Sequence, residues 1–209
     1  MNTTRRLALL AAALLPSAAA LAQDAAPTLQ EDPRAARYRD VERGFWVGFE
    51  AGYLGLFDTP VADPARYPSA GTSGGAAGGL LVGIDAGMEF GPRLAVSLFA
   101  LGGSQEASSS YGAFDVFAGG ADVRFAFLGL RDRNGDSRFL VYAHARAGYS
   151  VSTPEGLFGT NDFFLAGGPG IEYFTRLRHF SIGIAADYVR FVDAGADGFA
   201  LYPTVRYSF

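Results

Sequence analysis

Apolar and polar side chains alternate along most of the chain from residue 44 onwards. In residues 77–90, for example, large apolar side chains recur at every second position, and glycines and carboxylates fill most of the positions between them. A period of two residues is typical of a β-strand with two different faces. The pattern predicts eight strands and no helix in this part of the chain. The predicted strands are residues 44–57, 77–90, 94–101, 113–128, 138–151, 163–174, 180–192 and 199–209.

The connections between these strands differ in length. Those after the first, third, fifth and seventh strands are mostly longer than those after the second, fourth and sixth. Outer-membrane barrels have short periplasmic turns and longer external loops. The alternation therefore predicts an all-β fold, an eight-stranded antiparallel up-and-down transmembrane barrel with both termini on the periplasmic side. The predicted external loops are Asp58–Gly75, Gly102–Gly112, Ser152–Asp162 and Asp193–Gly198.

One face of the predicted strands carries both the charged residues and most of the strand glycines. The interior of an eight-stranded barrel is only just wide enough for side chains, so glycines mixed with a few long ion-pairing residues suit it. A soluble outer face has no need for so many glycines, which weaken strands. We therefore expect a polar network in the lumen. Its predicted members are Glu50, Asp85, Glu89, Asp122, Arg124, His144, Arg146, Glu172, Asp187 and Arg206.

The opposite face carries aromatic residues near the turn end of most strands, which predicts a girdle where lipid tails meet headgroups. These aromatic residues are Phe45, Phe90, Phe127, Phe139, Tyr173, Phe180, Tyr207 and Phe209. A soluble lipocalin-like barrel, which would put the apolar face inward, is the alternative. Gly44-Phe45-Trp46 matches the G-x-W fragment of lipocalins, but lipocalins add a helix after the barrel and this sequence ends on a strand.

The first 43 residues have a different composition from the barrel. Arg5 and Arg6 precede an apolar run, Leu7–Leu15, and Ala20-Leu21-Ala22 forms an A-x-A cleavage site, as in a secretory signal peptide. The following residues are polar and charged, which is typical of a flexible segment. The predicted organisation is a signal peptide at 1–22, a periplasmic leader at 23–43 and an outer-membrane barrel at 44–209.

The last strand resembles the terminal strand of Gram-negative outer-membrane barrels. Phe209, Tyr207 and Val205 place an aromatic or apolar side chain at alternate positions back from the final residue. In that class of protein this arrangement is the assembly signal. The resemblance implies recognition by the barrel-insertion machinery, outer-membrane lipids as surroundings, and the outer membrane of a Gram-negative bacterium as the location.

The chain after the leader resembles the small OmpA/OmpX-like barrels as a whole. The segment Arg39-Asp-Val-Glu-Arg-Gly-Phe45, which runs directly into a glycine-rich strand, looks like the CglE-type proteins of adventurous gliding motility. That resemblance implies a non-enzymatic anchor or adaptor whose partners are other envelope proteins of a gliding machinery. A small porin-like channel and a general envelope-integrity barrel are the alternatives.

Composition and the placement of the histidines limit the partners and reactions that the sequence predicts. The chain has no cysteine and no lysine, and its formal net charge is −4 at pH 7, which argues against nucleic acid as a partner. His144 is predicted to lie inside the barrel and His179 in a turn, so no catalytic triad is expected. Asp132–Asp136 lacks the glycine and glutamate positions of an EF-hand loop. We predict no enzyme activity, no cofactor and no metal site, and a lumen too crowded to conduct.

Overall fold

The computed structural model describes residues 44–59, 76–107, 113–131, 137–155, 158, 161–175 and 179–209. The predicted signal peptide and leader lie outside these residues. The described residues form eight strands, in the number and order that the alternation predicts. They are β1 (Phe45–Leu56), β2 (Ala77–Phe90), β3 (Leu94–Ala107), β4 (Ala113–Arg131), β5 (Ser137–Thr153), β6 (Asn161–Phe174), β7 (Phe180–Phe191) and β8 (Ala196–Ser208).

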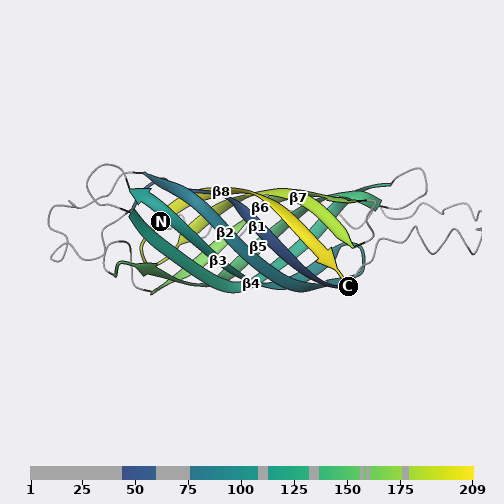
Figure 1. Cartoon of the computed structure of the whole chain (residues 1–209), viewed down its shortest axis with the longest axis horizontal. Helices are drawn as coiled ribbons and strands as arrows, with labels where there is room; N and C mark the ends of the chain where they lie inside the picture. The colour runs from purple at the N-terminus through teal and green to yellow at the C-terminus, as the bar shows by residue number, and fades with distance from the viewer. Residues whose placement is uncertain are drawn as a thin grey trace, which may run out of the picture. The chain divides into compact units, whose positions relative to one another are not determined.

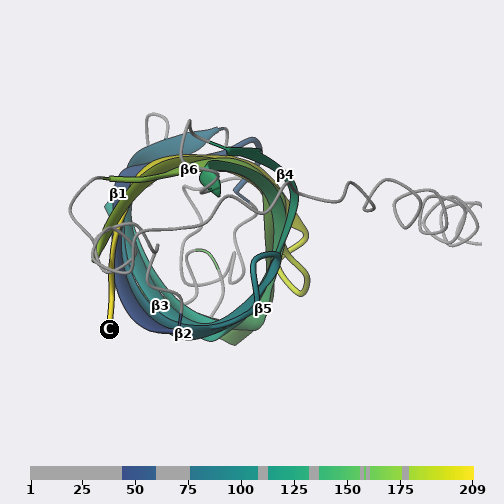
Figure 2. The same ribbon diagram turned by 90° about the vertical axis from the view of Figure 1, so that its right-hand side faces the viewer.

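The eight strands close into one barrel, which confirms the predicted fold class. Each strand pairs antiparallel with its neighbour in the sequence, and β1 pairs with β8 to complete the ring. The strands run obliquely around the barrel axis (Figure 1) and enclose a central space when seen from one end (Figure 2). Gly44 and Phe209 both lie at the end that carries the β2–β3 turn, where the backbone N–H of Phe209 donates to the carbonyl of Phe45 at 2.9 Å. We call this the turn end and the opposite end the loop end.

Several strands extend further toward the loop end than predicted. Residues 102–107 belong to β3, residues 152–153 to β5, residues 161–162 to β6 and residues 196–198 to β8. Gly103 shows the cause, since it is paired with Leu81 on one side and with Val116 on the other. Glycine and serine have low intrinsic strand propensity, but pairing on both sides overrides that preference. Three of the predicted external loops are therefore shorter than expected, and residues 60–75 of the first loop lie outside the described residues.

The predicted apolar face points outward. Leu98 is 70% exposed, Ile84 62% and Leu80 61%, although all three are large apolar residues. The polar face is the interior, so the orientation is that of a membrane barrel and the opposite of a lipocalin. In lipid, a closed barrel satisfies its backbone hydrogen bonds between strands, while the outward side chains meet hydrocarbon.

Two bands of aromatic side chains border this apolar wall. The predicted band lies at the turn end, where Phe45, Phe90, Phe127 and Phe209 are all at least half exposed. A second band at the loop end was not predicted. It consists of Tyr53, Phe57, Phe117, Tyr149, Tyr188 and Phe199. Aromatic girdles at both interfaces are a feature of outer-membrane barrels.

Within the described residues, no helix has the length and apolar character needed to cross a membrane.

Candidate functional site

The turn-end half of the lumen holds a network of charged side chains. All ten residues predicted for it lie there, with side chains that are almost completely buried. They come from seven of the eight strands, because inward positions recur at every second residue and the register aligns them across the barrel. Six carboxylates surround three guanidinium groups and one imidazole. We call this set the charged network.

Arg146 on β5 is the centre of one group. Its terminal nitrogens donate to both carboxylate oxygens of Glu50 at 2.8 and 2.7 Å, and its Nε donates to Asp122 at 3.3 Å. The guanidinium also lies 5.2 Å from the ring centres of Phe99 and Tyr202. A bidentate, stacked geometry of this kind depends on the planar fork of arginine and is not available to lysine.

Arg124 on β4 is the centre of a second group. It donates to Glu172 and, at 2.8 Å, to Glu89. Glu172 also accepts a hydrogen bond from the Ser181 hydroxyl at 2.6 Å. Arg206 lies 3.5 Å from Glu172, so that this one carboxylate joins strands β4, β6, β7 and β8.

Arg206 links the second group to β1 and β2. Its guanidinium stacks over the indole of Trp46, with 4.2 Å to the ring centre, and lies 3.7 Å from Asp85. Removing one charge from such a network would leave its partner buried without compensation.

His144 lies between two carboxylates. Its Nδ1 is 3.3 Å from Asp122 and its Nε2 is 2.7 Å from Asp187, which also accepts a hydrogen bond from the hydroxyl of Tyr202 at 2.8 Å. A cavity of only about 10 Å³ adjoins Asp187 and Tyr202. This volume is at the lower limit for one water molecule. The geometry suits a structural cross-link between β5 and β7 rather than an acid or base that must reach a substrate.

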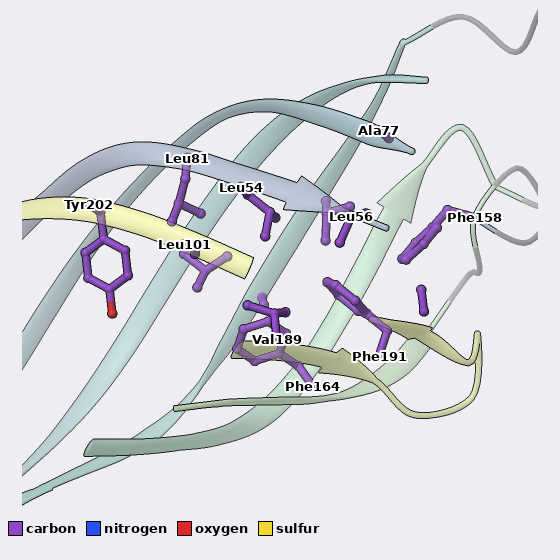
Figure 3. Close-up of a cluster of buried hydrophobic side chains, with 14 of the residues drawn as sticks. Leu54, Leu56, Ala77, Leu81, Leu101, Phe158, Phe164, Val189, Phe191 and Tyr202 are labelled. Atoms are coloured by element: carbon purple, nitrogen blue, oxygen red, sulfur yellow. The ribbon is translucent and has the colours of Figure 1, made fainter. Parts of the chain in front are cut away.

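The loop-end half of the lumen is filled by apolar side chains, which the sequence analysis did not predict. Figure 3 shows these side chains converging from several strands. Phe158, from the β5–β6 connection, stacks on Phe114 with 5.2 Å between ring centres and meets Phe191 edge-on at 5.0 Å. We call this set the apolar plug. Besides Phe99 and Tyr202, which also contact Arg146, its large members are Leu54, Leu56, Leu81, Leu101, Phe114, Val116, Phe158, Phe164, Val189 and Phe191.

A signal for the apolar plug was present in the sequence. Along β1, the inward positions change from Trp46 and Glu50 at the turn end to Leu54 and Leu56 at the loop end. On a strand such as β1, the inward face therefore changes character from one end to the other. Period-two analysis separates the two faces but does not compare the two ends of one face.

The terminal residues of β8 are anchored at the turn end. Tyr207 packs between the rings of His179 and Phe180, with 5.2 and 5.0 Å between centres. His179 Nδ1 lies 3.0 Å from the carbonyl oxygen of Ser208. Val205 faces outward and is 46% exposed, and Phe209 is 64% exposed. These side chains are accessible to lipid or to another protein, and their role in assembly stays a prediction.

Potential metal ligands do not gather in the parts of the chain that the structure describes, where no cluster of three or more His, Asp or Glu residues has a geometry that could hold an ion. The Asp132–Asp136 segment lies outside the described residues.

Comparisons with known proteins give the class of the fold. No family model and no curated protein matches the chain. Among solved structures, Neisserial surface protein A has a TM-score of 0.60 at 16% identity, over 79% of this chain and 97% of that one. OprG from Pseudomonas aeruginosa has a TM-score of 0.49 at 11% identity, over 80% and 97%. Ail of Yersinia pestis has a TM-score of 0.44 at 16% identity, over 79% and 100%.

The chain is thus a small eight-stranded barrel of the outer-membrane type. The likeness to Neisserial surface protein A supports this fold alone, because the identity is low. The resemblance to CglE-type proteins finds no support in these comparisons.

Proposed function

We propose that this protein is a non-enzymatic barrel of the Gram-negative outer membrane that acts as a structural anchor or adaptor. The observation that carries the proposal is the filling of the lumen from one end to the other. The charged network occupies the turn-end half together with a small apolar cluster around Leu140 and Phe174, and the apolar plug occupies most of the loop-end half. A barrel filled in this way acts through the parts that project from it, because loops carry binding more often than walls do.

The wall supports the proposed location. Large apolar side chains face outward between two aromatic bands, as a bilayer requires. The proposed location can be tested by membrane fractionation, combined with electrophoresis of heated and unheated samples, because closed barrels show heat-dependent mobility. We expect outer-membrane recovery and a mobility shift on heating. Recovery as a soluble periplasmic monomer would contradict the proposal and favour a lipocalin-like carrier.

The small porin-like channel is the competing function. Planar-bilayer recording of the purified barrel separates the two, because Arg124, Arg146 and Arg206 with Trp46 and Tyr142 occupy the lumen cross-section. We expect no steady conductance. A large, stable and weakly selective pore would contradict the anchor proposal and favour the channel.

The proposed assembly signal at the end of β8 has its own test. Removing Phe209 takes away an exposed ring that packs on Phe45 and Tyr207 at 6.4 and 5.0 Å. We expect strongly reduced outer-membrane levels with unchanged export. A Ser208→Ala variant, which alters an inward-facing neighbour, is the matched control. Normal assembly without Phe209 would contradict recognition of this strand by the insertion machinery.

The partner that we propose is an envelope component of a gliding machinery. The support is the likeness of residues 39–45 to CglE-type proteins and lies in the sequence alone. The test is a clean deletion in the source organism, scored for single-cell gliding on firm agar and for envelope integrity. Loss of gliding with an intact envelope is the expected result. Normal gliding with a detergent-sensitive envelope would favour a general envelope-integrity role.

A further inference from the structure

The hydrogen-bonded wall of the barrel is interrupted beside Pro169 in β6. The pairing of β6 with β7 reaches Gly167 opposite Tyr188 and resumes only at Gly170 opposite Ala185. Proline has no backbone N–H and cannot donate to a ladder, so it is normally confined to sheet edges. A closed barrel has no edge, and Pro169 therefore leaves a gap in a ladder that faces lipid.

A second gap lies beside Pro203 in β8. The pairing of β8 with β1 reaches Thr204 opposite Glu50 and resumes only at Leu201 opposite Tyr53. Pro169 and Pro203 are the only prolines within the eight strands. The ladders β1–β2, β2–β3, β3–β4, β5–β6 and β7–β8 run without interruption, and β4–β5 is irregular only near the turn end.

Both gaps flank the same hairpin, which consists of β7 and β8. They also lie at nearly the same height, since Ala186 beside the first gap is opposite Leu201 beside the second. The two strands of the hairpin are thus paired with each other along their whole length. Their backbone pairing with β6 and β1 is confined to the parts nearer the turn end and the loop end. We call β7 and β8 together the C-terminal hairpin.

Side chains bridge the interval that the ladders leave open. Asp187 is the inward-facing residue of β7 that is not paired in the β6–β7 ladder. Tyr202 is the inward-facing residue of β8 that is not paired in the β1–β8 ladder. These two bond to each other at 2.8 Å. Both contact β5 across the lumen: Asp187 lies 2.7 Å from His144, and the Tyr202 ring lies 5.2 Å from the Arg146 guanidinium. The middle of the hairpin is therefore tied by side chains to β5, on the far side of β6, rather than to its neighbours by backbone.

The outer surface of the first gap is hollowed. A groove of about 230 Å³ lies over it, lined by apolar residues that include Pro169, Ile171, Ile184, Ala186 and Leu201. Fewer packing contacts along this seam mean less resistance to a local separation of strands.

We propose that the C-terminal hairpin is a movable panel in the barrel wall. Its middle separates transiently from β6 and β1, and Asp187 with Tyr202 forms the latch that holds it closed. The remaining wall, from β1 to β6, stays a continuous sheet. The conformational freedom of the barrel wall then lies at the two proline gaps.

The test is residue-resolved amide hydrogen exchange of the full barrel in lipid nanodiscs. The informative amides are those of intact pairs that border the gaps, such as Ile184 and Leu201. We expect them to exchange at least ten-fold faster than amides at matched height in β3 and β4, such as Phe99 and Gly120. Equal protection on the two sides of the barrel would overturn the proposal.

Two pairs of variants separate panel motion from general loosening. Asp187→Asn weakens the latch directly, whereas Asp122→Asn weakens the other carboxylate contact of His144 and one contact of Arg146 but changes no residue of the hairpin. We expect only Asp187→Asn to accelerate exchange selectively in β7 and β8. Pro169→Ala restores a donor and should slow exchange in β7 about five-fold, the equivalent of one net hydrogen bond, while Pro92→Ala in the β2–β3 turn should not. Uniform acceleration by both Asp variants, or no slowing by Pro169→Ala, would overturn the proposal.

Discussion

The two halves of the lumen are filled mainly by side chains of opposite character, charged at the turn end and apolar at the loop end. In the charged network, each buried group depends on particular partners, as Arg146 does on Glu50 and Asp122. In the apolar plug, rings and branched chains such as Phe158 and Phe191 pack without directional bonds. Charged side chains are costly to bury unless paired, whereas apolar side chains gain by burial alone. The stability of the turn-end half therefore depends on which side chains are paired. The stability of the loop-end half depends on how completely the space is filled.

The largest expected effect comes from breaking a pair in the charged network. Glu50→Ala leaves Arg146 buried without its bidentate partner, and breaking a buried pair costs about 3–5 kcal/mol. The free energy of unfolding can be followed by urea titration in detergent through Trp46, the single tryptophan, which is 2% exposed and stacked on Arg206. Its fluorescence reports on the turn-end half directly.

The control for that change removes both partners together. In the double variant Glu50→Leu with Arg146→Met, no charge is stranded, and replacement of a buried pair by apolar residues is often neutral or stabilising. We expect recovery of most of the lost stability. A double variant as unstable as Glu50→Ala would show that the turn-end half depends on packing in the same way as the loop-end half.

The next effect is a truncation in the apolar plug. Leu54→Ala removes a fully buried side chain, and substitutions of this kind cost about 2–5 kcal/mol depending on how well the site collapses. Unlike the loss caused by Glu50→Ala, this loss of stability should be recovered when volume is added elsewhere in the plug. Ala200 lies opposite Leu54 in the register, so the double variant Leu54→Ala with Ala200→Leu restores the volume. Urea titration of the single and paired variants checks this. Lack of any rescue would mean that the plug also requires specific partners.

A smaller effect is expected for the Phe158 contact at the loop end. Phe158→Ala opens the outermost part of the plug but leaves the charged network filled, so single-channel recordings should stay closed. Arg146→Ala enlarges the turn-end half and leaves the plug, so it should also stay closed. Only the combination should produce conductance. A pore in either single variant would show that one half alone seals the barrel.

The smallest effect is expected at the rim. Arg190 donates to Asp197 at 2.6 Å, but more than a third of both side chains is exposed. Surface pairs of this kind contribute little to stability because water screens them. Asp197→Asn should therefore change the urea midpoint far less than Asp122→Asn, which acts inside the lumen. Similar shifts for the two variants would contradict the distinction between rim and network.

Sequence alternation predicted much of this structure. It identified the eight strands, the outward apolar face and the inward positions of all ten charged residues, because a period of two separates faces wherever one face is charged. It did not predict that β3 extends through residues 102–107. Glycine and serine in this segment have low strand propensity, but pairing with both neighbouring strands holds the segment in the sheet. It also missed the apolar plug, because period-two analysis does not compare the two ends of one face and because Phe158 lies in a connection outside the strand pattern.

The pairing of β1 with β8 has a consequence for the time course of assembly. Strand β1 is made early and its partner β8 last, so the seam between Trp46 and Ser208 cannot form until the chain is almost complete. Contacts between distant segments are slow to form because the intervening chain must first be ordered. Throughout that delay β1 presents an unpaired edge together with the exposed rings of Phe45 and Phe49, a combination that promotes aggregation. A barrel of this topology therefore needs its first strand shielded until the last strand is available.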